Sequence, residues 1–165
     1  MTPTATTNQI PLGAHVRAET GRELQATLAE LIELELVGKQ LHWTVVGPLF
    51  RPLHEQLDEL VDSWRELADT VAERVVAIGQ FPDGQAAEVA RASELRKLEA
   101  APIPDQVVIR ELTHRIATVA ELVRERMDHL AEIDAASQDV LIEVVRTLEQ
   151  QLWMVRVQST EVRES

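Results

Sequence analysis

The sequence predicts an all-α fold, a four-helix bundle in which one connection is much longer than the others. Four long segments place apolar residues at helical spacing, and no segment shows the alternation expected of a strand. The chain has 165 residues, of which 45% are hydrophobic, enough to bury a core. Wholesale disorder is therefore excluded, and one domain is favoured over two.

The first predicted helix covers residues 20–42. Thr20 and Glu23 have the spacing of a capping box at its start. Its apolar stripe contains Leu24, Leu28 and Leu31. Residues 1–15 precede this helix and carry almost no charge, so we expect them to form a flexible tail.

The second predicted helix follows a break at Gly47 and Pro48. Pro52 suits its first turn because proline already has a helical φ, and Gly79 supplies the C-terminal stop. The stripe between them is Leu53, Leu57, Leu60, Trp64, Leu67, Val71, Val75 and Ile78. One face of this helix is therefore apolar along its length, and the other faces carry its charged residues.

The third predicted helix starts near Pro104 and Asp105, and the fourth near Asp134 or Ser137. The stripe of the third is Val108, Leu112, Ile116, Val119, Val123, Met127 and Leu130. The stripe of the fourth is Val140, Leu141, Val144, Leu148, Leu152 and Val155. Each helix therefore has one face to bury against the others.

The lengths of the connections predict the topology. Short links join the first helix to the second and the third to the fourth, so each pair should be antiparallel. The link between Gly79 and Ile103 has roughly 25 residues and contains a short helical pattern at residues 86–98. A four-helix bundle with one long crossover is the ferritin-like topology. We expect it to occupy residues 16–160, followed by a short C-terminal tail at residues 161–165.

The chain is acidic, and this limits its partners. Its 28 Asp and Glu residues exceed its 16 Lys and Arg residues, for a net charge of −12, so the body of the protein should repel nucleic acid. The absence of cysteine excludes disulfides, iron–sulfur clusters and cysteine-based zinc sites. No signal peptide or membrane-spanning run is visible, so we expect a soluble cytoplasmic protein, with association with the nucleoid left open.

Four potential metal ligands share one face of the second predicted helix. At helical spacing, His54, Asp58, Asp69 and Glu73 fall within an arc of roughly 100°. His54 and Glu73 are nevertheless about 28 Å apart along the axis, so one chain cannot close all four around one ion. The residue numbers of His54 and Glu73 add up to 127, and so do those of Asp58 and Asp69. Two copies of this helix crossing antiparallel on a two-fold axis would therefore form two equivalent sites.

His42 extends this ligand set. It ends the first predicted helix, so an antiparallel hairpin places it beside His54 and Asp58 of its own chain. One site would then combine His42, His54 and Asp58 from one subunit with Asp69 and Glu73 from a two-fold partner. Two imidazoles and three carboxylates suit a divalent metal such as Fe(II), Mn(II) or Zn(II). The alternative is an ordinary solvated face on an acidic helix.

The segments around these ligands also form a family pattern. Residues 38–48 (GKQLHWTVVGP), 53–60 (LHEQLDEL) and 68–74 (ADTVAER) resemble the Dps family, the DNA-protection proteins of starved cells, also called mini-ferritins. The resemblance covers essentially the whole chain, and its general character is similar to that of actinobacterial members.

The resemblance implies a homododecameric hollow shell built from two-fold dimers. Ferroxidase centres at the two-fold interfaces would contain His42, His54, Asp58, Asp69 and Glu73. Members of the family oxidise Fe(II), usually with hydrogen peroxide as the favoured oxidant, and store Fe(III) mineral in the cavity. Consuming both reagents protects DNA from Fenton radicals in stationary phase and under oxidative stress. Zinc or manganese could substitute for iron at these ligands.

Other residues receive roles from the resemblance alone. Trp43 would lie near the iron and trap stray oxidising equivalents, although packing at the dimer interface explains it equally well. Glu55 and Glu59 would face the cavity and nucleate mineral, although lone acids on an acidic helix are more often simply solvated.

Acidic residues at the start of the fourth helix have two interpretations. By resemblance, Asp134, Asp139 and Glu143 would line pores that draw cations inward. Acids at this position also suit the helix dipole, which is sufficient reason for them.

Glu111 and His114 match a Glu-x-x-His motif, but the fourth helix has no counterpart, so we interpret this match as a surface coincidence.

The remaining expectations concern the locations of two tryptophans and the ability of the two chain ends to bind DNA. Trp64 lies at the predicted two-fold axis and could anchor the interface, whereas Trp153 should belong to the core. Neither end of the chain is rich in Lys or Arg, so direct DNA binding should be weak, although Arg17 and Arg22 or bridging cations could support it. The alternative functions are a DNA-compacting nucleoid protein with a secondary metal site and an acidic helical interaction module.

Overall fold

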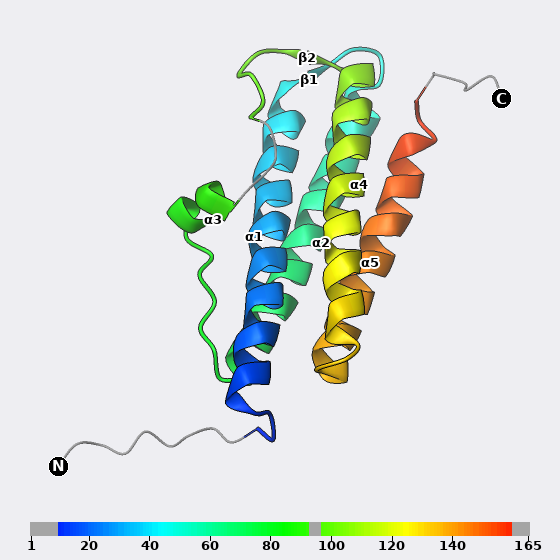
Figure 1. The fold of residues 1–165 in the computed structure, drawn as a ribbon. Coiled ribbons are helices and arrows are strands. Elements are labelled where there is room, and N and C mark those ends of the chain that lie inside the picture. Colours follow the sequence, from blue (N-terminus) through cyan, green and yellow to red (C-terminus); the bar gives the residue numbers. More distant parts are fainter. Residues whose placement is uncertain (1–9, 93–96, 160–165) are drawn as a thin grey trace.

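A computed structural model describes residues 10–92 and 97–159 of the chain and shows a bundle of four long helices (Figure 1). These are α1 (Ala14–Thr44), α2 (Phe50–Ala77), α4 (Asp105–Leu130) and α5 (Ala135–Arg156), with a short helix, α3 (Ala86–Ala92), between α2 and α4. α1 packs mainly against α2, and α4 against α5. The predicted all-α bundle with a long crossover is confirmed.

The crossover is long because α2 ends at the opposite end of the bundle from the start of α4. It runs back along the outside of α1, and α3 lies beside that helix (Figure 1). Gln25 holds it there, because its side-chain amide donates to the carbonyl oxygen of Asp83 and accepts from the Asp83 N–H, both at 2.8 Å. α3 is shorter than predicted, since Lys97 and Leu98 are not helical.

The predicted ends of the later helices are confirmed. Pro52 is the third residue of α2. After α2 the chain turns at Gly79, whose φ is +82°, a value that favours glycine. The N–H groups of Gly79 and Gln80 donate to the carbonyls of Val76 and Val75, which satisfies two of the last backbone acceptors of the helix. α4 begins at Asp105 and α5 directly after Asp134, as the sequence indicates.

α1 starts earlier than predicted. Its first residue is Ala14, and Thr20 is fully buried within the helix, so the expected capping box with Glu23 is wrong. The extra turns are supported by α4, because Glu19 lies 3.0 Å from the Nε2 atom of His129. Residues 1–9 of the expected N-terminal tail and the whole of the expected C-terminal tail lie outside the described residues.

The expectation that the chain has no strand is also wrong. Val45–Val46 (β1) pairs in parallel with Ile103–Pro104 (β2), next to the loop between α1 and α2. A two-residue strand is too short to show alternation, so it leaves no periodic signal in the sequence. The pairing joins the end of α1 to the residues that precede α4.

Two tryptophans lie where the sequence does not place them. Trp64 is fully buried inside one chain and donates from Nε1 to Gln151 at 2.8 Å, so it is a core residue and its predicted role as an interface anchor is wrong. Gly38 makes room for it, because a Cβ at this position would lie 2.7 Å from the indole ring. Trp153 is 55% exposed, so its assignment to the core is also wrong. It lies off the inward stripe of α5, beside Leu152.

A partly buried ion pair fixes the start of α5 against α2. The Arg74 guanidinium lies 3.0 Å from Asp134 Oδ2 and donates to the Ser137 hydroxyl, which itself donates to Asp134 at 2.6 Å. Burial raises the pKa of Asp134, but the hydrogen bonds from Ser137 and Arg74 outweigh it and hold the pKa below its usual range. The carboxylate therefore stabilises the folded chain when it is ionised.

We expect Arg74→Met to lower the free energy of unfolding by roughly 3 kcal/mol at pH 7, because it leaves a buried carboxylate without its cation. The folded-state pKa of Asp134 is depressed, so this contribution is present above the unfolded pKa of about 3.9 and is lost as the pH falls through the folded value. Urea unfolding followed by circular dichroism should therefore show a gap between wild type and variant that shrinks in acid.

Arg124→Met is the matched control, because it removes an exposed ion pair with Glu149 between α4 and α5. This variant should change stability little at either pH. Equal behaviour of the two variants would contradict a stabilising role for the Arg74–Asp134 pair.

Candidate metal centre

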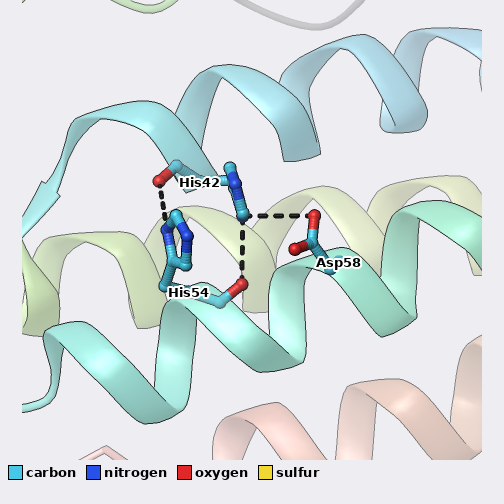
Figure 2. A group of neighbouring side chains, drawn as sticks. All are labelled: His42, His54 and Asp58. Carbon is cyan, nitrogen blue, oxygen red and sulfur yellow. Dashed lines mark hydrogen bonds and ion pairs between the residues drawn. The ribbon is translucent and has the colours of Figure 1, made fainter.

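Three potential ligands meet where α1 ends and α2 begins. His42, His54 and Asp58 each offer one ligand atom, and these atoms all lie within 4.8 Å of one another (Figure 2). His42 is buried, His54 is half-buried and Asp58 is exposed. The site therefore opens toward solvent on the side of α2.

The two histidines hold each other in place. His42 Nδ1 lies 3.0 Å from the backbone oxygen of His54, and His54 Nδ1 lies 3.0 Å from the backbone oxygen of His42. The rings are stacked, with centroids 3.6 Å apart and planes 22° from parallel. An Nδ1–H that donates to a carbonyl leaves the lone pair on Nε2, the usual arrangement for a metal-binding imidazole. Both rings are thus oriented before any ion arrives.

Lys39 provides the nearest cation to Asp58. Its Nζ atom lies 2.8 Å from Asp58 Oδ1, and His42 Nδ1 lies 3.3 Å from the same oxygen. The hydrogen bond from Lys39 holds the pKa of Asp58 below its usual range, and the positive charge of Lys39 also lowers it. Asp58 is therefore a carboxylate at neutral pH. An incoming metal ion would compete with the Lys39 ammonium for it.

The loop that turns α1 into α2 is tied to the start of α4 by Asp105. This carboxylate is buried and accepts hydrogen bonds from the N–H groups of Leu49, at 2.8 Å, and Gln106, at 2.7 Å. Gly47 packs directly on it with φ +127°, and a Cβ at Gly47 would lie 2.5 Å from Asp105 Oδ2. The loop is thereby fixed, and with it the distance between the two histidines.

Sequence reasoning missed Lys39 and Asp105. The break at Gly47 and the helix start at Asp105 were both visible, but they are far apart in sequence and nothing local connects them. Lys39 lies three residues before His42, close to one helical turn, so the spacing alone could have placed it on the same side as that ligand.

Asp69 and Glu73 lie farther along α2 and do not join the three-residue group within one chain. Asp69 is about 16 Å from Asp58 along the helix axis at 1.5 Å per residue. Both carboxylates are exposed, and neither forms an ion pair with any residue in the described ranges. Their positions match the expectation that a single chain cannot gather all five residues.

The residues with secondary expected roles occupy the surface near these ligands. Trp43 is 69% exposed, and Lys39 Nζ lies 6.0 Å from the centroid of its ring. Glu55 is exposed and pairs with Arg51 at 2.9 Å, and Glu59 is exposed on the same helix. All three side chains are accessible in one chain.

The acids at the start of α5 differ from one another. Asp139 and Glu143 are exposed, whereas Asp134 is buried and bonded to Arg74. On α4, Glu111 lies 3.3 Å from the buried Arg115, and no metal-binding group among the described residues includes Glu111 or His114.

The chain is similar to proteins of known family. The model of the ferritin-like domain matches residues 22–164. DNA protection during starvation protein 2 of Deinococcus radiodurans is 35% identical over 133 residues, which cover 81% of this chain but only 55% of that protein. The chain thus spans little more than half the length of this relative. The DNA protection during starvation protein of Mycolicibacterium smegmatis is 33% identical over 135 residues, or 81% of this chain and 73% of that protein.

Solved structures agree with these relatives. A structure described as Mycobacterium smegmatis Dps, tetragonal form, superposes with a TM-score of 0.87 at 29% sequence identity. The match covers 93% of this chain and 93% of that one. The similarity therefore extends over the whole bundle, including the hairpin that carries the histidines.

We expect Gly47→Ala to disturb the candidate centre through the loop. Alanine is strained at positive φ, at a cost of about 2 kcal/mol, and its methyl group would push Asp105 away from the Leu49 N–H. The unfolding midpoint should fall, and the imidazole signals of His42 and His54 should shift in NMR spectra of the purified protein.

Gly13→Ala is the control, because a Cβ at Gly13 meets nothing within 4 Å. It should leave both the midpoint and the histidine signals close to those of wild type. Unchanged histidine signals in Gly47→Ala would show that the loop does not position the two rings.

Proposed function

Because the chain belongs to the Dps family of ferritin-like proteins, we propose that it binds Fe(II), oxidises it and stores the resulting Fe(III) inside a protein shell. The observation that carries this proposal is the preoriented group of His42, His54 and Asp58 at the hairpin of α1 and α2. Iron is the substrate and the cargo of such a protein. In the proposed function, this chemistry protects DNA by removing Fe(II) and peroxide together.

The complete site is proposed to form between two subunits. The partner subunit's Asp69 and the partner subunit's Glu73 would face Asp58 and His54 across a two-fold axis near the middle of α2. Two features support this arrangement: both carboxylates are exposed, and a groove of about 490 Å³ lies beside Asp69. Leu28, Ile32 and Ala72 contribute apolar surface to this groove, which suits burial against a second copy of the chain.

The donor set fits the oxidation of iron. Imidazole nitrogens bind Fe(II), whereas carboxylate oxygens favour the harder Fe(III), so the mixed set lowers the barrier to losing an electron. Hydrogen peroxide takes up two electrons, one from each of two Fe(II) ions, and with two protons it is reduced to two water molecules. Because both electrons are delivered together, no hydroxyl radical is released. We propose peroxide as the favoured oxidant, with dioxygen as the alternative.

The shell is proposed to be a homododecamer built from two-fold dimers. Asp139 and Glu143 are candidates for the lining of cation pores, and Glu55 and Glu59 for sites where mineral begins to form, since all four carboxylates are exposed. Asp134 is a weaker pore candidate because its carboxylate is bonded to Arg74.

The negative charge of the chain favours protection of DNA by removal of Fe(II) and peroxide over protection by direct binding to DNA. A net charge of −12 repels phosphate, and of the two arginines considered for DNA contact only Arg22 is exposed, Arg17 being half-buried. None of the described helices is long and apolar enough to cross a membrane. We propose that the protein acts in the cytoplasm.

The first test is an anaerobic titration with Fe(II), followed by hydrogen peroxide while the absorbance of Fe(III) is recorded. Wild type should bind Fe(II) saturably and oxidise it rapidly. The His54→Ala, Asp58→Ala double variant should lose both properties, because it removes two of the three ligands that one chain contributes.

A matched control removes one exposed histidine and one exposed aspartate that lie outside α2, in the His15→Ala, Asp128→Ala double variant. It should retain wild-type binding and oxidation. Oxidation by wild type no faster than in protein-free buffer would overturn the proposed ferroxidase activity.

A second test addresses the contribution of the partner subunit. The His54→Ala, Asp58→Ala variant and the Asp69→Ala, Glu73→Ala variant should each be inactive alone. Mixed dimers of the two contain one site without a defect, so co-expression in equal amounts should restore roughly one quarter of wild-type Fe(II) binding. Sites made within a single subunit would give no recovery on mixing.

A further inference from the structure

A cleft lies between α4 and α5, close to the N-terminal end of α4 and the C-terminal end of α5. Its volume is about 600 Å³, and it shares no residue with the metal ligands. Its lining comes from Ile109, Arg110, Thr113, His114, Ala117, Leu152, Arg156 and Ser159. The antiparallel packing of the two helices brings the second turn of α4 next to the last turn of α5.

The cleft is basic in a strongly acidic chain. Arg110, His114 and Arg156 line it, and no acidic side chain does. Arg110 and Arg156 are exposed, and within the described ranges neither of them forms an ion pair or a side-chain hydrogen bond. Most of the other described arginines do have carboxylate partners: Arg51, Arg65, Arg74, Arg91, Arg115, Arg124 and Arg126.

The positions of the basic residues on the two helices place their side chains in the same part of the cleft. Arg110 and His114 are four residues apart, so both lie on the same face of α4. Arg156 is the last residue of α5 and reaches the cleft from the other wall. Thr113 already donates its hydroxyl hydrogen to the carbonyl of Ile109. The side-chain nitrogen donors that line the cleft are the two guanidinium groups and the imidazole.

The remaining lining is apolar. Leu152 and Ala117 are half-buried and provide the accessible apolar surface, and Ile109 behind them is fully buried. A cleft of this size fits a small organic molecule and is larger than a bare oxyanion requires. A ligand that satisfies both halves of the lining carries an anionic group at one end and an apolar body at the other.

We propose that this cleft binds a small organic phosphate, with its phosphate group held by Arg110 and Arg156 and its carbon skeleton packed on Ala117 and Leu152. Arginine is suited to this role because its planar guanidinium donates two parallel hydrogen bonds to phosphate oxygens. The His114 imidazole adds a further N–H donor. The site is independent of the proposed iron chemistry, so either proposal can fail without the other.

The test is isothermal titration calorimetry on the assembled protein at low ionic strength, with phenyl phosphate and inorganic phosphate as probes. Wild type should bind phenyl phosphate saturably and more tightly than inorganic phosphate. Each arginine removed should weaken binding by about tenfold or more, as expected for a charged hydrogen-bonded pair, so the Arg110→Gln, Arg156→Gln variant should lose it.

The matched control is the Arg22→Gln, Arg146→Gln variant, which removes two exposed arginines outside the cleft. It should bind phenyl phosphate as wild type does. Equal weakening in both double variants would show a general effect of net charge and would overturn the proposal, as would the absence of saturable binding to wild type.

Two further measurements test whether the cleft instead contacts another copy of the chain or binds nucleic acid. Sedimentation velocity should give the same assembly for wild type and for Arg110→Gln, Arg156→Gln. A change in assembly without phenyl phosphate binding would make the cleft an interface between copies of the chain. Retention of a DNA duplex without binding of either small phosphate would assign it to nucleic acid, and both results would overturn the proposal.

Discussion

The exchange of hydrogen bonds between His42 and His54 is the constraint on which the candidate centre depends. Each imidazole is held by the backbone of the other residue, so neither ring can turn without breaking a bond at 3.0 Å. This exchange requires the end of α1 and the start of α2 to stay in one register. Asp105 and Gly47 hold the hairpin in that register by tying its loop to the start of α4. Because each Nδ1 atom is bonded to a backbone oxygen of the hairpin, the Nε2 atoms of His42 and His54 are left to bind a metal ion.

Acidic residues outnumber basic ones in this chain, and the carboxylates differ in whether a cation lies beside them. Glu30 and Asp134 are matched with Arg126 and Arg74, and these pairs fasten α1 to α4 and α2 to α5. On α2, Asp58 lies beside Lys39, whereas Asp69 and Glu73 form no ion pair with any described residue. Like charges along one helix face repel one another when no counter-ion is present. Binding of a metal ion would relieve that repulsion.

Sequence patterns predicted the parts of the fold that depend on local chemistry. The apolar stripes located the four long helices, and Pro52 and Gly79 marked the two ends of α2, because each of these signals acts within a few residues. The patterns failed where distant segments meet. The strand pairing of Val45 with Ile103 is an example, and the burial of Trp64 is decided by space opposite Gly38. For the candidate metal centre, helical spacing together with the antiparallel hairpin predicted that His42, His54 and Asp58 lie side by side, whereas the contact of Asp105 with the loop required knowledge of the tertiary structure.

Division of the proposed ligand set between two subunits has a consequence for assembly. α2 is a continuous helix, so its two ends cannot fold back on one another, and its distal carboxylates can reach the histidines only through a partner. Bringing three carboxylates together without a cation raises their pKa values and opposes dimer formation. A divalent ion bound at the interface removes this repulsion and, by linkage, stabilises the dimer as much as the dimer stabilises binding of the ion. In such a protein the iron supply and the integrity of the shell are therefore coupled through the same five side chains.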